Sequence, residues 1–86
     1  MLMVISVSDM YKTGEEYEYW FNNRYVSLPK AYAYYKAAAD NGYLKAFTKM
    51  GDIYVSKYYP FNNKSQSDKY YSKAFKQYKQ KIDSDG

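Results

Sequence analysis

Apolar residues recur at helical spacing in several stretches of this chain, and short polar segments separate these stretches. The clearest stretch runs from about residue 67 to 82, where apolar side chains return every three or four positions and lysines fill most of the others. Ser65, followed three residues later by Asp68, resembles a capping box at the start of a helix. We therefore expect a helix with one apolar and one lysine-rich face. Its apolar positions are Tyr70, Tyr71, Ala74, Phe75, Tyr78 and Ile82.

Two more helices are predicted on either side of a tight turn. The first spans 28–40, because Ser27 is placed to cap it and Pro29 fits its first turn. The Asp-Asn-Gly sequence that follows accepts left-handed backbone conformations and ends this helix. So short a connection makes the next helix, over 43–58, the second arm of an antiparallel hairpin.

Gly51 lies in the middle of this second arm. A glycine inside a helix costs about 1 kcal/mol relative to alanine, so its presence calls for a reason. We interpret it as a crossing point, where another helix packs against bare backbone.

The N-terminal stretch, over 3–20, fits a helix with Ser8 or Asp9 as its cap. Val4 and Val7 are also compatible with a short strand. The helical interpretation is favoured by the internal repeat described next. Its apolar positions are Val4, Val7, Met10, Tyr11, Gly14 and Tyr17.

The chain repeats itself at an interval of 36 to 37 residues. A shift of 37 aligns Gly14 with Gly51 and, three residues later, one tyrosine with another. A shift of 36 aligns the Tyr-Tyr pair at 34–35 with the pair at 70–71. A repeat of this length built from two helices is typical of helical-repeat proteins.

At these positions the chain resembles the Sel-one-like repeat, a branch of the tetratricopeptide-type solenoids. The resemblance implies an all-α fold, a short α-solenoid of antiparallel helix hairpins with about four helices. Its single domain, 1–86, would contain arm B at 3–20, arm A at 28–40, arm B at 43–58 and arm A at 66–82. The residues that the resemblance assigns to repeat packing are Gly14, Tyr17, Ala31, Tyr35, Ala38, Gly42, Ala46, Gly51, Tyr54, Tyr71 and Ala74.

The connection after Tyr54 departs from the family pattern. Bulky aromatic residues over 57–61 replace the family's usual glycine-rich loop, so we expect this connection to have its own conformation. Two hairpins are also fewer than the roughly three stacked repeats that such folds usually need. Self-association or a bound partner would supply the missing stacking.

Members of this family generally hold other proteins, which implies a concave partner-binding groove lined by the two A arms. Tyr32 is the most informative candidate, because it lies off the apolar stripe of its helix, and exposed aromatic residues often anchor interfaces. The lysines have a simpler alternative role as a solvated helix face. The groove candidates are Tyr32, Lys36, Lys69, Lys73 and Lys76.

The two connecting loops are a second candidate surface, because each combines aromatic residues with a basic one. Tryptophan, tyrosine and arginine are the residue types enriched in binding hot spots. The alternative is that each loop folds back and covers the small core. The loop candidates are Tyr19, Trp20, Phe21, Arg24, Tyr58, Tyr59 and Phe61.

Composition removes most catalytic and metal-binding chemistry. A chain of 86 residues is one domain, and its 14 tyrosines lead us to expect an aromatic core. Cysteine and histidine are both absent, which excludes disulfides, thiolate metal sites and Ser-His or Cys-His catalysis. We therefore predict no enzyme activity, no catalytic residue, no metal and no cofactor. No apolar run is long enough to span a membrane, which favours a cytoplasmic protein without membrane contact.

Charge leaves nucleic acid open as a second partner. The net charge is +4, and lysines interleave with aromatic residues near the C-terminus, as in proteins that stack on bases and neutralise phosphates. However, arginine, the preferred reader of bases and phosphates, occurs once. The leading prediction is therefore a non-catalytic protein–protein interaction module. It would act as an adaptor, a scaffold or a small inhibitor of the kind that phages and mobile elements encode against a host enzyme.

Overall fold

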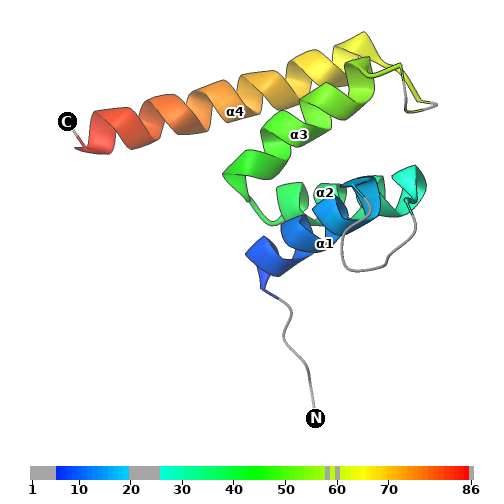
Figure 1. Cartoon of the computed structure of the whole chain (residues 1–86). Coiled ribbons are helices and arrows are strands. Elements are labelled where there is room, and N and C mark those ends of the chain that lie inside the picture. The colour runs from blue at the N-terminus through cyan, green and yellow to red at the C-terminus, as the bar shows by residue number, and fades with distance from the viewer. Residues whose placement is uncertain (1–5, 20–25, 58, 60, 86) are drawn as a thin grey trace.

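The described part of the chain is entirely helical, as predicted. The computed structural model describes residues 6–19, 26–57, 59 and 61–85, and these contain four helices and no strand (Figure 1). Val7 begins a helix, which removes the strand alternative there, whereas Val4 lies outside the described residues. The helices are α1 (Val7–Tyr19), α2 (Leu28–Asp40), α3 (Leu44–Val55) and α4 (Lys64–Asp85).

The helices pack as two pairs. α1 lies along α2, α3 lies along α4, and a smaller contact between α2 and α3 joins the pairs (Figure 1). α4 has 22 residues and α3 only 12, so the C-terminal half of α4 runs past the end of α3 as a projecting arm. One helix therefore has a length of surface that no other described helix covers.

Two of the predicted helix ends are confirmed. The Ser27 side chain accepts a hydrogen bond from the backbone N–H of Lys30, at 3.4 Å, and so caps α2. α2 ends at Asp40, and Gly42 takes the left-handed conformation with φ of 82°. Glycine is favoured there because it has no Cβ to clash with the backbone.

Three other predicted ends are wrong. The Ser6 hydroxyl accepts from the backbone N–H of Asp9, so neither Ser8 nor Asp9 caps α1. α3 ends at Val55, three residues early, because the backbone is extended at the next position. α4 begins at Lys64, where Asn63 Oδ1 accepts a backbone N–H at 3.1 Å. Asn63 therefore caps the helix, and the residues of the predicted capping box, Ser65 and Asp68, lie within the helix.

The mid-helix glycines lie at helix crossings in both pairs. A Cβ placed on Gly14 of α1 would be 2.8 Å from ring carbons of Tyr35 on α2. A Cβ placed on Gly51 of α3 would be 2.6 Å from ring carbons of Tyr71 on α4. In both pairs, therefore, a tyrosine ring lies directly on helix backbone, and only glycine leaves room for it.

Two further contacts are present in both helix pairs. Tyr17 stacks on Tyr34, with ring centroids 5.7 Å apart, and Tyr54 stacks on Tyr70 at 6.0 Å. The Tyr17 carbonyl accepts a hydrogen bond from the backbone N–H of Ser27, and the Tyr54 carbonyl accepts one from Asn63. Each loop is thus closed by the carbonyl of the tyrosine that also stacks on the next helix.

The core is built from alanine as much as from aromatic residues. Five of the eleven buried hydrophobic residues described are alanines, and three are tyrosines. The expectation of an aromatic core is correct only in part: four of the eleven residues are aromatic and other aromatic side chains pack around them, but small residues bring the helices close and most tyrosines are partly exposed. Ser67, fully buried on α4, donates a hydrogen bond to the Gly51 carbonyl at 2.8 Å.

Candidate functional site

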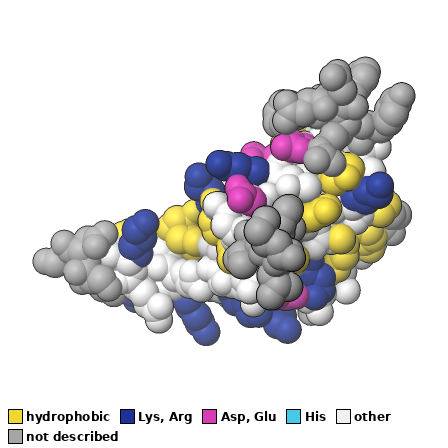
Figure 2. Space-filling view, turned by 90° about the horizontal axis from the view of Figure 1, so that it is seen from below, with side chains coloured by type: hydrophobic (Ala, Val, Ile, Leu, Met, Phe, Trp, Pro, Cys, Tyr) yellow, Lys and Arg dark blue, Asp and Glu magenta, His cyan; other side chains and the backbone are white. Residues whose placement is uncertain are grey.

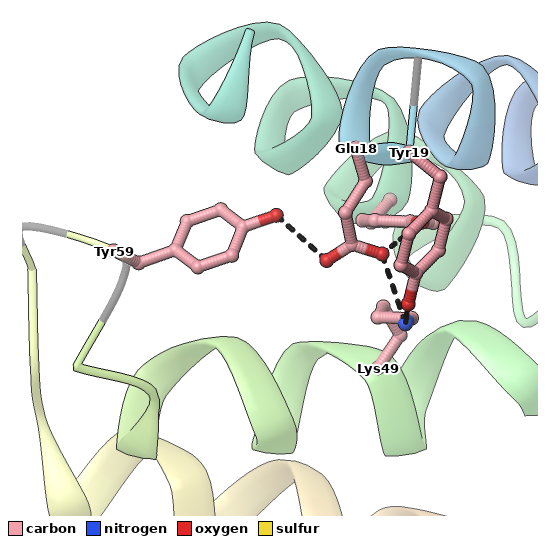
Figure 3. Close-up of polar contacts among 5 residues, drawn as sticks. Glu18, Tyr19, Lys49 and Tyr59 are labelled. Atoms are coloured by element: carbon pink, nitrogen blue, oxygen red, sulfur yellow. Dashed lines mark hydrogen bonds and ion pairs between the residues drawn. The ribbon is translucent and has the colours of Figure 1, made fainter. Parts of the chain in front are cut away.

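A half-buried polar cluster joins the two helix pairs. The Glu18 carboxylate, near the end of α1, accepts hydrogen bonds from Lys49 of α3 at 3.0 Å and from Tyr35 of α2 at 2.8 Å. Its other oxygen accepts a hydrogen bond from Tyr59, at 3.0 Å (Figure 3). Lys49 also donates to the Tyr19 hydroxyl at 3.1 Å. The side chains of Glu18 and Lys49 are only 14% and 16% exposed, so solvent screens this pair poorly.

Every pKa shift in the cluster stabilises the protonation state that the group has at neutral pH. Burial alone would raise the pKa of Glu18, but hydrogen bonds from Lys49 and Tyr35 outweigh it and lower that pKa. Burial alone would lower the pKa of Lys49, but its bonds to Tyr19 and Glu18 raise it well above the usual range. Burial and the Glu18 carboxylate raise the pKa of both Tyr35 and Tyr59.

These shifts decide what the cluster can do chemically. A general base or acid works best with a pKa near the working pH, and an activated lysine needs a lowered pKa. Glu18 and Lys49 are shifted in the opposite directions. We therefore interpret the cluster as a structural link between α1 and α3, and we call it the polar fastener. A cavity of about 220 Å³ beside it is lined by Glu18, Tyr19, Lys49, Asp52, Ile53, Ser56 and Tyr59.

Metal ions need groups of ligand side chains that lie close together. Within the described residues, no group of three or more acidic side chains is close enough to hold a metal ion. Among the same residues, no helix is both long and apolar enough to cross a membrane.

Four of the seven loop candidates lie outside the described residues, and a fifth is exposed. Trp20, Phe21, Arg24 and Tyr58 lie outside the described residues. Tyr19 is exposed at the end of α1, with Lys49 5.3 Å from its ring centroid.

The two remaining loop aromatics, Tyr59 and Phe61, turn inward. Tyr59 is 5% exposed, and Phe61 packs 4.6 Å from the ring centroid of Tyr32. For these two side chains, the alternative that the loop folds back over the core describes the structure.

Two of the groove candidates, Lys73 and Lys76, line one cleft together with Asp40, the ion-pair partner of a third candidate, Lys36. Lys36 pairs with Asp40 at 3.0 Å on α2, and Lys73 lies 5.5 Å from the ring centroid of Tyr70. Lys69 and Lys76 are exposed on α4. All four lysines are exposed to solvent. Their alternative role, as the solvated face of a helix, requires the same exposure.

Tyr32 does not stand apart from the packed residues, so the expectation of an exposed aromatic there is wrong. Its hydroxyl lies 2.8 Å from that of Tyr54, and its ring packs against Phe61 as part of an aromatic cluster over the core. Its position off the main stripe of α2 faces the 61–63 connection, which the helical pattern of α2 alone does not reveal.

This placement changes the expected result of removing the Tyr32 ring. We expect Tyr32→Ala to lower the free energy of unfolding by about 2 kcal/mol, since a half-buried ring is lost from a packed cluster. Tyr32→Phe keeps the ring and loses one hydrogen bond, so about 0.5–1 kcal/mol is expected. Urea unfolding followed by circular dichroism measures both. Equal stability of Tyr32→Ala and the native chain would show that the aromatic cluster contributes nothing.

A run of exposed apolar side chains lies along α4. Tyr71, Phe75, Tyr78 and Ile82 follow one another at spacings of four, three and four, and all four are exposed. Phe75 and Ile82 are 68% and 70% exposed. We call these four residues the outer stripe. Figure 2 shows hydrophobic surface beside lysine side chains along the projecting arm.

The outer stripe corrects the predicted burial pattern of this helix. Tyr70 and Ala74 are buried with Ser67 against α3, whereas the outer stripe lies on the neighbouring face. The apolar positions of α4 therefore form two adjacent stripes, of which α3 covers the first and also contacts Tyr71 of the second at Gly51. On the inner side, a cleft of about 470 Å³ opens between α4 and the α2–α3 turn, with Asp40, Phe47, Tyr70, Lys73, Lys76 and Gln77 among its lining residues.

Sequence reasoning overlooked Glu18 and Lys49. One signal was available, because Glu18 follows Gly14 by four residues and so lies on the face of α1 that meets another helix. An acid on such a face needs a partner. The position of Lys49 opposite it depends on how the two helix pairs meet, which no local pattern reveals.

A scan against protein-family models, a search of curated proteins and a search of solved structures each found no significant match to this chain. The Sel-one-like assignment therefore stays a prediction that rests on the chain's own residues.

Proposed function

We propose that this chain is a non-catalytic interaction module that binds one partner protein, as an adaptor, a scaffold or a small inhibitor. The observation that carries the proposal is the outer stripe of α4, which exposes two tyrosines, a phenylalanine and an isoleucine to solvent. A contiguous exposed apolar stripe of this kind is typical of a surface that a partner covers. We also propose a cytoplasmic location.

The proposal includes a helical-repeat origin for the fold. It is supported by the contacts that recur in both helix pairs, namely a tyrosine ring on a glycine, a tyrosine stack and a carbonyl that closes the loop. In a solenoid of such pairs, the exposed face of the last helix is where a further repeat would pack. A partner protein in that place would perform the same covering role.

Nucleic-acid binding is the second candidate, and one observation favours it. Between residues 69 and 82 the chain has five lysines and no acidic residue, interleaved with aromatic side chains. Such a surface can neutralise phosphates and stack on bases. It ranks lower because the chain has a single arginine, Arg24, which is far from this segment in the sequence.

Affinity capture from a nuclease-treated lysate of the source organism tests the proposal. The native chain is immobilised beside a Gly14→Leu variant, which we expect to unfold far more readily and so to retain proteins that bind any exposed apolar chain. Proteins that both baits retain are discarded, and the remainder are identified by mass spectrometry. We expect one protein in stoichiometric amount on the native bait alone.

Two other results would count against the proposal. Retention of many proteins that disappears on nuclease treatment would favour the nucleic-acid alternative. No difference between the two baits would contradict a specific protein partner.

A further inference from the structure

We infer that the outer stripe of α4 is a docking seam for an acidic amphipathic helix of a partner protein. This inference deepens the proposed function and rests on it, because it names the surface and the chemistry of the partner. It concerns Tyr71, Phe75, Tyr78 and Ile82, together with the lysines that flank them.

The spacing of the stripe favours a helical partner. Successive steps of four, three and four residues are those of the a and d positions in paired helices, where each side chain inserts between residues of the facing helix. From Tyr71 to Ile82 the seam runs about 16 Å along the axis, roughly three turns. A shallow depression of about 430 Å³ lies on this face, lined by Asp68, Tyr71, Ser72, Phe75 and Lys76.

The flanking charges set the chemistry of that helix. With Phe75 and Ile82 at a positions, Lys79 and Lys81 take the e and g positions that face the partner's own flanks. Both are exposed, and the described residues of α4 after Asp68 and up to Ile82 include no acidic side chain. A partner with glutamates on either side of an apolar seam would pair with these lysines.

A second copy of this chain fits the seam less well. Pairing two copies along α4 would bring together two segments, each with five lysines and no acid between 69 and 82. Like charges facing each other across a helix pair oppose association. The charge pattern therefore selects an acidic partner over self-association.

A membrane surface is also less favoured. Helices that lie in the interfacial plane have a broad apolar face, often with tryptophan, leucine and phenylalanine. Here two of the four stripe residues are tyrosines, and the neighbouring face of α4 is occupied by α3.

A designed peptide tests the inference directly. The probe is a fluorescent helical peptide of about 18 residues, with leucines at the same four-three-four spacing and glutamates at the flanking positions. The matched control peptide has lysines in place of the glutamates. Binding to the full chain is measured by fluorescence anisotropy at low and moderate salt. Vesicles of phosphatidylserine with phosphatidylcholine and a single-stranded RNA oligonucleotide are tested in parallel.

Three variants of the chain locate the binding surface. Phe75→Ala/Ile82→Ala removes two highly exposed stripe residues, so the fold is retained and peptide binding should weaken by at least about tenfold. Lys79→Gln/Lys81→Gln should weaken it by about threefold to tenfold and reduce its salt dependence. Lys12→Gln/Lys45→Gln makes the same charge change at exposed positions on α1 and α3, and binding should stay within about twofold.

The inference is overturned if the acidic peptide does not bind, or if it binds the stripe variant as tightly as the native chain. Binding of vesicles or RNA in place of the peptide also overturns it and assigns the stripe to that ligand. Capture from lysate keeps the two proposals apart. If Phe75→Ala/Ile82→Ala retains the same single protein as the native bait, the seam is wrong and the proposed function stands.

Discussion

Replacing Gly14 with leucine should destabilise the protein by about 3 kcal/mol, near the upper end of the usual cost of overpacking a core. A Cβ at this position already lies 2.8 Å from the Tyr35 ring, and leucine adds three more carbons. Tyr35 has no room to move, because its side chain is fully buried and its hydroxyl bonds to Glu18. Leucine is also a better helix former than glycine, so a loss of stability cannot come from helix propensity.

Gly51→Leu is the matched control, since it makes the same change at the equivalent crossing of the second pair. A Cβ there lies 2.6 Å from the Tyr71 ring, which is closer than at Gly14. However, Tyr71 is 37% exposed, so its ring can swing into solvent and lose only its hydrogen bond to Asp52. We expect a cost of about 1 kcal/mol.

Urea unfolding followed by circular dichroism gives both free energies. The informative quantity is the difference between the two variants, because the intrinsic gain from replacing glycine is shared. Equal costs would mean that exposure of the facing tyrosine does not control the tolerance of the crossing. A greater cost at Gly51 would mean that Tyr71 is held more firmly than its exposure indicates.

The helices themselves were largely readable from the sequence, because they depend on local periodicity. The turn at Gly42 and the cap at Ser27 are also local features, and both are confirmed. The failures lie at ends where two signals competed. At Lys64 the helix begins one residue after Asn63, which caps it more directly than the Ser65–Asp68 pair could.

Surface assignments were harder, because they depend on which helices pack together and for how long. Periodicity placed Tyr70 and Phe75 on one apolar face of α4, yet the structure buries the first and exposes the second. α3 has 12 residues and α4 has 22, so α3 cannot cover the whole length of both stripes. The error at Tyr32 is the reverse, because this residue was expected to be exposed and is packed. It lies off the stripe of α2 but contacts Phe61, which belongs to a connection whose path helical spacing does not predict.

The polar fastener has a corresponding explanation. Glu18 and Lys49 are 31 residues apart, and the position of Glu18 four residues after Gly14 does not indicate which residue it meets. Their meeting depends on the angle between the helix pairs, which is a tertiary property. At that angle both charged side chains are largely buried, so leaving either without its partner would destabilise the fold. This cost favours the one arrangement of the helix pairs in which the two side chains meet.

Glu18→Gln should destabilise the protein by about 2–3 kcal/mol at neutral pH. Removal of the carboxylate charge leaves the Lys49 ammonium half-buried and weakens the acceptor of two tyrosine hydroxyls. Removing one member of a buried pair usually costs about 3–5 kcal/mol, and the remaining 14–16% exposure of these side chains lowers that figure. Asp68→Asn, which breaks the exposed pair with Lys64, is the matched control and should change stability by less than about 1 kcal/mol.

The pH dependence of this cost tests its electrostatic origin. Because the folded state lowers the pKa of Glu18, its contribution is complete above the unfolded value of about 4.3 and disappears as the pH falls through the folded value. Protonated glutamate resembles glutamine in charge and shape, so the stability gap between the native chain and Glu18→Gln should narrow as the pH falls below about 4.3 and close once the pH is below the folded pKa. Urea unfolding of both proteins from neutral pH to below the folded pKa measures the gap. A gap that stays constant would show that Glu18 stabilises the fold by packing alone, and the fastener would then owe nothing to the ion pair with Lys49.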